Sequence, residues 1–146
     1  HKVIAMTHSY LTEKTADYTD NTWYTISPQT SGRDFWDKFV KLSPNVVFVL
    51  CGHTGHPGKF EDSVAYRVDK NDTGRKVHQM MFNVQILGGG WEGNGGDGWL
   101  RILEFMPDGK TIKVKTYSPL FGISPSTRHL AHRTGKIDQF DMVVDF

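Results

Sequence analysis

Two histidines follow two apolar stretches of the chain, at the point where each stretch ends. His8 comes just after the apolar residues 3–6, and His53 comes three residues after the apolar run 46–50. Neutral imidazole is the commonest protein ligand for transition metals. Taken singly, each histidine is more simply a polar residue that begins a loop. If the two stretches are neighbouring parallel strands, about 4.8 Å apart, both rings can reach one ion, and we therefore expect His8 and His53 to be metal ligands.

The stretch that carries His53 has the pattern of a strand buried on both faces. Residues 46–50 are Val-Val-Phe-Val-Leu, an unbroken apolar run bounded by Cys51 and Gly52, and such short runs are typical of strands inside parallel sheets. Polar side chains begin abruptly at its carboxyl end, which is where open α/β sheets bind ligands. The fold class that we expect is α/β.

A helix between the two apolar stretches would make them parallel strands. Ser31 and Asp34 are spaced as a helix-start signal, and Pro44 ends the helix because the residue before a proline resists the helical conformation. A strand, a helix and a strand in this order predict a right-handed crossover with both carboxyl ends at one edge of the sheet. Five apolar residues share one face of the predicted helix: Phe35, Trp36, Phe39, Val40 and Leu42.

The second half of the chain has the patterns of a β-rich structure. Alternating residues and turn residues predict two antiparallel hairpins, residues 64–68 with 77–85 and residues 100–105 with 111–117. Residues 140–144 predict a last strand. The remaining segments are expected to be a surface loop at 9–30, a glycine-dense loop at 88–98 and an irregular segment at 118–136.

Length and composition fit one globular domain. The chain has 146 residues, of which 38% are hydrophobic and 23% charged. A formal net charge of +1 gives no electrostatic reason to expect nucleic acid or an anionic membrane as a partner. No apolar segment approaches the roughly 20 residues that span a bilayer, and a single cysteine excludes an intrachain disulfide. The chain opens at His1 and enters a strand at once, which predicts a piece of a longer protein.

Four stretches together resemble the carboxyl-terminal half of calcineurin-like metallophosphoesterases, most closely their bacterial, often exported, branch. They are residues 7–11 (Thr-His-Ser-Tyr-Leu), 50–54 (Leu-Cys-Gly-His-Thr), 95–101 (Gly-Gly-Asp-Gly-Trp-Leu-Arg) and 116–119 (Thr-Tyr-Ser-Pro). The resemblance implies a two-layer β-sandwich with flanking helices and two metal ions (Zn, Mn or Fe) bridged by a carboxylate. It assigns His8 and His53 to one metal ion. Export of the protein is suggested only by the bacterial branch that the chain resembles.

The family's last block is Gly-His-x-His, and its final histidine binds the second metal. Here that position holds Gly55, and His56 comes one residue later. A one-residue shift on an extended chain turns the side chain to the opposite face, although a turn at Gly55 could bring it back. His56 is therefore a candidate ligand with two possible orientations.

The family's amino-terminal blocks, Asp-x-His, Gly-Asp-x-x-Asp and Gly-Asn-His-Asp/Glu, do not occur in the chain. In the family they supply the bridging carboxylate, an asparagine ligand and a catalytic histidine. Residues 1–146 are therefore expected to be a partial domain that lacks its amino-terminal part and is not active by itself.

Several other residues have side chains that could contribute to the site. Trp91 and Asp97 of the glycine-dense loop are candidate substrate-binding residues; Trp91 could wall a cleft with Trp99, or both could pack against the sheets. A turn role for Asp97 stays open. Three further histidines and the cysteine are expected to be structural or exposed rather than ligands: His78, His129, His132 and Cys51.

The function that these patterns predict is hydrolysis of a small phosphomonoester or phosphodiester by metal-activated water in the full-length protein. Two alternatives stay open: a non-catalytic β-rich binding module, and a family member that keeps only one metal. The sequence leaves the substrate, the metal, the oligomeric state and the compartment undecided.

Overall fold

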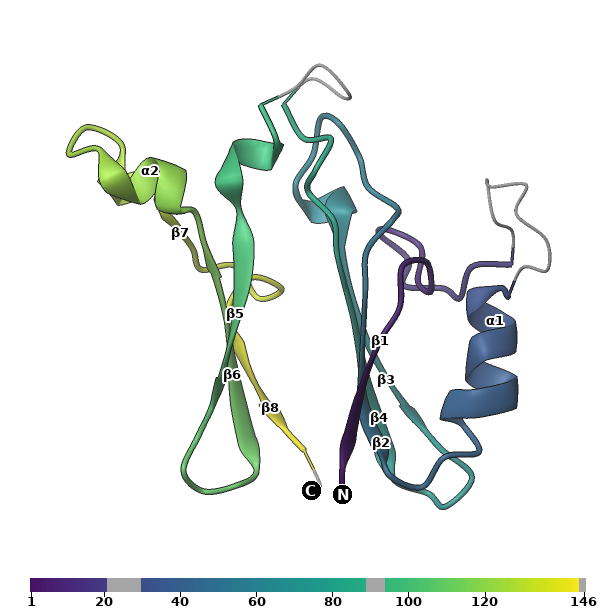
Figure 1. Ribbon diagram of the computed structural model, residues 1–146. Coiled ribbons are helices and arrows are strands. Elements are labelled where there is room, and N and C mark those ends of the chain that lie inside the picture. Colours follow the sequence, from purple (N-terminus) through teal and green to yellow (C-terminus); the bar gives the residue numbers. More distant parts are fainter. Residues whose placement is uncertain (21–29, 89–93, 145–146) are drawn as a thin grey trace.

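A computed structural model describes residues 1–20, 30–88 and 94–144, which form a mixed α/β, β-rich fold with two four-stranded sheets and a few short helices (Figure 1). The strands are β1 (Val3–Met6), β2 (Val46–Cys51), β3 (Val64–Lys70), β4 (Lys76–Phe82), β5 (Leu100–Phe105), β6 (Thr111–Tyr117), β7 (His132–Arg133) and β8 (Phe140–Val143). The helical elements are α1 (Gly32–Phe35), the π-helical turn η1 (Trp36–Val40), α2 (Pro119–Ile123) and the 3-10 turns η2 (Glu61–Ser63), η4 (Gly96–Gly98) and η5 (Arg128–Leu130).

The first sheet has the strand order β1-β2-β4-β3. Strands β1, β2 and β4 are parallel, and β3 returns antiparallel to β4 through the turn at 71–74. The predicted parallel pairing of the two histidine-bearing strands is confirmed. The burial of β2 is also confirmed, because all four residues from Val46 to Val49 are buried.

The second sheet is antiparallel and centres on β6, which pairs with β5, β7 and β8. The hairpin β5–β6 and the last strand β8 confirm the predictions for this part of the chain. The irregular segment predicted at 118–136 is corrected in part, because it contains α2, η5 and β7. Strand β7 is only two residues long, too short for an alternation signal to be read.

The two sheets pack face to face around an apolar core. Phe48 and Met80 of the first sheet meet Ile112, Val114 and Met142 of the second, and all five are 2% exposed or less. A second cluster lies on the outer face of the first sheet, where α1 and η1 cover β2 and β4 (Figure 1). No described helix has the length and apolarity needed to cross a membrane.

The helix prediction is right in position and partly wrong in its buried face. Ser31 caps α1 by accepting the Asp34 amide at 3.0 Å, and Trp36 and Val40 are buried. Phe39 is 44% exposed and Leu42 59% exposed. The Lys41 amide donates to the Trp36 carbonyl, an i to i+5 bond that makes this turn a π-helix. A π-turn changes the angular spacing of side chains, so the face expected for an α-helix does not persist.

The surface loop predicted at 9–30 is wrong for its first half. Tyr10 and Leu11 are fully buried, Tyr18 is 4% exposed, and Leu11 forms a β-bridge with Tyr18. This segment belongs to the cluster under α1. Residues 21–29 lie outside the described part of the chain.

Candidate metal-binding site

Strands β1 and β2 bring His8 and His53 to the same edge of the first sheet. The parallel ladder continues past the ends of both strands: the Thr7 amide donates to the Leu50 carbonyl and the Gly52 amide to the His8 carbonyl, both at 3.0 Å. The backbone that carries each ring is therefore held by the sheet rather than by a free loop.

The two rings face each other through one nitrogen each. Nδ1 of His53 lies 3.0 Å from Nε2 of His8, and the ring centroids are 4.7 Å apart at an interplanar angle of 57°. Two nitrogens bound to one tetrahedral ion at about 2.05 Å would be separated by about 3.3 Å. The observed separation therefore fits two ligands of one ion with only a small adjustment.

His53 is held in an unusual backbone conformation. Its φ is 74°, and the Thr54 amide donates to the Gly52 carbonyl at 3.0 Å, so His53 is the central residue of a three-residue turn. A residue with a side chain pays on the order of 1–3 kcal/mol for such a conformation. The turn directs the His53 ring back toward His8.

The electrostatics of the site favour a neutral His53 ring. Burial, and secondly the proximity of His8, lower the pKa of His53 below its ordinary value. In a neutral pair one facing nitrogen donates its proton to the other. If both facing nitrogens serve as ligands, the rings must carry their protons on Nδ1 of His8 and Nε2 of His53, and this tautomer change releases no proton to solvent.

A buried polar network fixes the segment that follows His8. The Tyr10 hydroxyl donates to Oε1 of Gln79 at 2.5 Å, and Gln79 is fully buried on β4. The Tyr18 hydroxyl lies 3.1 Å from the same oxygen, and Nε2 of Gln79 donates to Asp69 at 2.6 Å. Sequence reasoning missed this network, and the only signal for it was the polar Gln79 inside a strand pattern.

Asp69 is the charged end of the network. Burial raises its pKa, but hydrogen bonds from Arg67, Gln79 and Tyr18 outweigh that effect and hold the pKa below its ordinary value. Arg67 makes two hydrogen bonds to the carboxylate, at 2.6 and 2.9 Å, and a third to the Ala16 carbonyl. The network thus ties β3 and β4 to the segment after β1.

An open cleft of about 510 Å³ lies beside His53. Its lining is rich in hydroxyl and carboxylate groups and includes Thr12, Glu13, Thr15, Asp17, Asp20 and Thr54. Three carboxylates in one cleft repel a phosphate group unless a cation stands between them.

His56 does not join the histidine pair. Its Nδ1 accepts the Gly58 amide at 3.1 Å, and its own amide donates to Ser63 at 2.9 Å. Gly55 is pressed against Asn83, because a Cβ at Gly55 would lie 2.5 Å from the Asn83 carbonyl oxygen. In residues 1–20, 30–88 and 94–144, no group of three or more His, Cys, Asp or Glu is placed to hold a metal.

No contact among the described residues brings the candidate substrate-binding residue Asp97 to His8 or His53. Asp97 has a φ of 54° and a side chain hydrogen-bonded to Asn94, so it serves the turn that precedes β5. Trp99 packs against Phe60 and Phe121, with ring centroids 5.8 and 5.6 Å away, as the packing interpretation expects. Trp91 lies outside the described residues.

The histidines and the cysteine that were not expected to be ligands are either packed inside the structure or exposed at its surface. His78 is 5% exposed: its Nε2 donates to the Val143 carbonyl at 3.1 Å, so its Nδ1 accepts the Tyr66 hydroxyl at 2.6 Å. His129 and His132 are exposed. Cys51 packs against the core under α1, and burial raises the pKa of its thiol to about 12.

Comparison with known proteins gives one relative and no family. Over 114 residues the chain is 33% identical to the uncharacterized protein YvnB of Bacillus subtilis (strain 168). The matched stretch covers 78% of this chain and only 8% of that protein, so the chain spans less than a tenth of its relative. No known protein family matches the chain, and no solved structure matches it.

Proposed function

We propose that this chain is the carboxyl-terminal part of the catalytic domain of a calcineurin-like metallophosphoesterase, with His8 and His53 as ligands of one metal ion. The observation that carries the proposal is the 3.0 Å separation of two imidazole nitrogens at the adjacent ends of parallel strands. In this proposal the two packed sheets are part of the family's two-layer sandwich, and α1 is one of its flanking helices. The bridging carboxylate and the remaining ligands belong to amino-terminal blocks outside residues 1–146.

The reaction proposed for the full-length protein is hydrolysis of a small phosphomonoester or phosphodiester. When bound, two metal ions (Zn, Mn or Fe) lower the pKa of a water molecule and clamp phosphate oxygens for in-line attack. His8 and His53 contribute neutral nitrogens held by the sheet. The cleft beside His53 carries three carboxylates, and a cation bound beside them would offset their repulsion of the phosphate.

A second candidate is a family member whose chain supports only one metal. The observation that favours it is the contact of Gly55 with Asn83, which leaves no room for a ligand side chain at the family's second histidine position. The hydrogen bond that Nδ1 of His56 accepts from the Gly58 amide favours the same alternative, because this nitrogen is then engaged within its own turn. A non-catalytic binding module is the outcome left if the histidine pair binds no metal.

Titration of the purified chain with Co²⁺, followed by visible absorption and calorimetry, tests the ligand assignment. We expect binding that His8→Ala and His53→Ala each weaken at least tenfold. His129→Ala, in an exposed histidine of the same chain, is the matched control and should leave binding unchanged. Equal binding by wild type and His8→Ala would remove His8 from the site.

The activity itself is tested in the longer polypeptide that the proposal requires. That protein should hold about two metal ions and hydrolyse bis-p-nitrophenyl phosphate, and His8→Ala should abolish turnover. A content of one ion with retained turnover would favour the single-metal candidate. Absence of both metal and turnover would favour the binding module.

A further inference from the structure

Three parallel strands of the first sheet end at the edge that holds the histidine pair. They lie in the order β1-β2-β4, and His8 and His53 follow the first two of them. The residue that follows β4 is Asn83. Because ligands bind at the carboxyl ends of such strands, the third strand end belongs to the same site, and the proposed function gives it no role.

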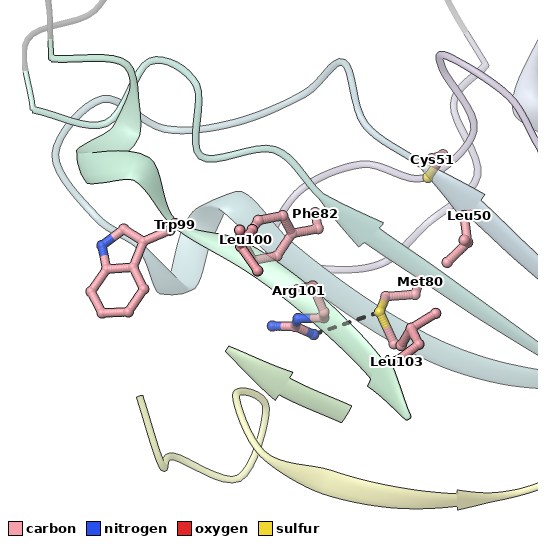
Figure 2. A pocket seen from close by; sticks show the side chains of 8 residues that line it. All are labelled: Leu50, Cys51, Met80, Phe82, Trp99, Leu100, Arg101 and Leu103. Carbon is pink, nitrogen blue, oxygen red and sulfur yellow. Dashed lines mark hydrogen bonds between the residues drawn. The ribbon is translucent and has the colours of Figure 1, made fainter. Parts of the chain in front are cut away.

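Asn83 continues the pairing of β4 by one residue. Its amide donates to the Ser63 carbonyl at 2.9 Å, which prolongs the ladder between β4 and the segment that enters β3. Phe82, the last residue of β4, lines a cavity of about 320 Å³ between the two sheets (Figure 2). Because successive side chains of a strand point to opposite faces, the Asn83 side chain lies on the other face of the first sheet.

The pairing of β2 with β4 places Asn83 beside His53. Cys51 is in register with Met81, and the same register continued by two residues brings Asn83 level with His53. Neighbouring strands are about 4.8 Å apart, so the backbones of these two residues are neighbours at the edge of the sheet.

The Asn83 side chain packs against the turn that carries His53. A Cβ at Gly52 would lie 3.9 Å from Cβ of Asn83, and a Cβ at Gly55 would lie 3.4 Å from its Nδ2. Asn83 is half-buried, and among the described residues its side-chain amide makes no hydrogen bond. A strong hydrogen-bonding group is therefore held beside the candidate metal site and is not used by the fold.

The direction of the His53 ring separates a role at the metal from a role at the substrate. The positive φ of His53 turns the ring toward His8, so an ion held by both rings lies between β1 and β2. Asn83 lies on the other side of β2, about one strand spacing away. That is too far for a ligand of the same ion, but the oxygens of a phosphate bound to the ion extend beyond it toward β4.

We propose that Asn83 contacts the substrate, with Nδ2 donating a hydrogen bond to an oxygen of the phosphate group. The inference rests on the proposed function, because it needs an ion at His8 and His53 to hold the phosphate. The cleft on the other side of the site offers carboxylates, which only accept hydrogen bonds when ionised. A positioned amide supplies the donor that they lack, and donors aimed at a reacting phosphate stabilise its charge.

Calorimetric titration of the metal-loaded longer polypeptide with phenylphosphonate, a phosphomonoester analogue that is not hydrolysed, tests the inference. We expect Asn83→Ala and Asn83→Leu each to weaken phenylphosphonate binding at least tenfold with unchanged metal content, because hydrogen bonds to charged groups are the stronger ones. Leu keeps the volume of the side chain, so its loss reports on the amide rather than on packing against the turn. In both variants kcat/KM for bis-p-nitrophenyl phosphate should fall in parallel. Asn45→Ala is the matched control and should bind as wild type, because Asn45 is exposed and precedes β2 at the opposite edge of the sheet.

The outcomes separate this inference from the proposed function. A wild-type polypeptide that holds no metal would overturn both. With the metal in place, a wild type that does not bind phenylphosphonate, or equal affinity in wild type and both variants, would overturn this inference alone. Loss of metal in both variants would show that Asn83 positions the His53 turn and does not contact the substrate. Circular dichroism shows whether the variants are folded; if they are not, the NMR signal of the Asn83 side-chain amide in the wild type decides, and it must shift when phenylphosphonate is added.

Discussion

Nδ1 of His53 lies 3.0 Å from Nε2 of His8, although 45 positions separate the two residues in the chain. Two features of the fold produce this contact: the parallel pairing of β1 with β2, and the positive φ of His53. The first fixes the separation of the two backbones. The second turns the His53 ring toward its partner at a cost in stability, and this cost leads to the first prediction.

Replacing His53 by Gly should give a more stable protein than replacing it by Ala. Both changes remove the imidazole, but only Ala keeps a Cβ in the left-handed region, where it costs about 1–2 kcal/mol. Part of the gain from Gly is lost to its greater freedom in the unfolded chain. We expect His53→Gly to exceed His53→Ala by about 1 kcal/mol in the free energy of unfolding, measured with urea. Equal stabilities would show that the turn at His53 stores no strain.

The candidate ligands could be predicted from the sequence because two strong signals coincide on them. The apolar runs before His8 and His53 fixed the strands, and the crossover rule fixed their direction. The anchoring of this pair could not be predicted in the same way. Tyr10 and Tyr18 lie in a segment without periodicity, and their burial depends on hydrogen bonds to Gln79, 69 and 61 residues away.

Two further features lay beyond what patterns can indicate. Phe39 is exposed because η1 is a π-helix, and hydrophobic spacing does not distinguish an i to i+4 from an i to i+5 turn. Strand β4 lies parallel to β2 and beside it, whereas its hairpin with β3 specifies only the antiparallel contact. The strand order of a sheet is a long-range property that short segments do not encode.

The pKa of Asp108 should depend on the hydroxyl of Thr111. Hydrogen bonds from the Thr111 side chain at 2.6 Å and from the Thr111 and Lys110 amides lower this pKa to about 2. A carboxyl whose pKa is lower in the folded state stabilises the fold above its unfolded value of 3.8, and this contribution disappears as the pH falls through about 2. Asp108→Asn should therefore be less stable than wild type at pH 5, and the difference should shrink toward pH 2.

The same prediction has a direct spectroscopic form. NMR titration should find a higher pKa for Asp108 in Thr111→Val and an unchanged pKa in Thr111→Ser, which keeps the hydroxyl. An unchanged value in Thr111→Val would assign the shift to the backbone amides alone.

Gly55 should tolerate no side chain, in contrast to Gly58 three residues later. A Cβ at Gly55 would lie 2.5 Å from the Asn83 carbonyl oxygen, whereas at Gly58 the nearest atom is 3.6 Å away, on the His56 ring. We expect Gly55→Ala to lose about 2 kcal/mol of unfolding free energy by overpacking and Gly58→Ala to stay within about 0.5 kcal/mol of wild type. A stable Gly55→Ala would mean that Asn83 moves aside, and the second-metal position would then be open to a ligand.

Gln79 should position His8 as well as stabilise the fold. Gln79→Leu leaves the buried hydroxyls of Tyr10 and Tyr18 without their shared acceptor, which should cost about 3 kcal/mol in unfolding free energy. Because Tyr10 follows His8 by two residues, the loosened segment should also weaken Co²⁺ binding several-fold in protein that remains folded. The double variant Tyr10→Phe with Gln79→Leu should recover part of the stability, since both hydrogen-bonding partners are then replaced. The exposed Gln139→Leu is the control for both measurements, and Co²⁺ affinity that is equal in Gln79→Leu and Gln139→Leu would show that the network supports the fold without positioning His8.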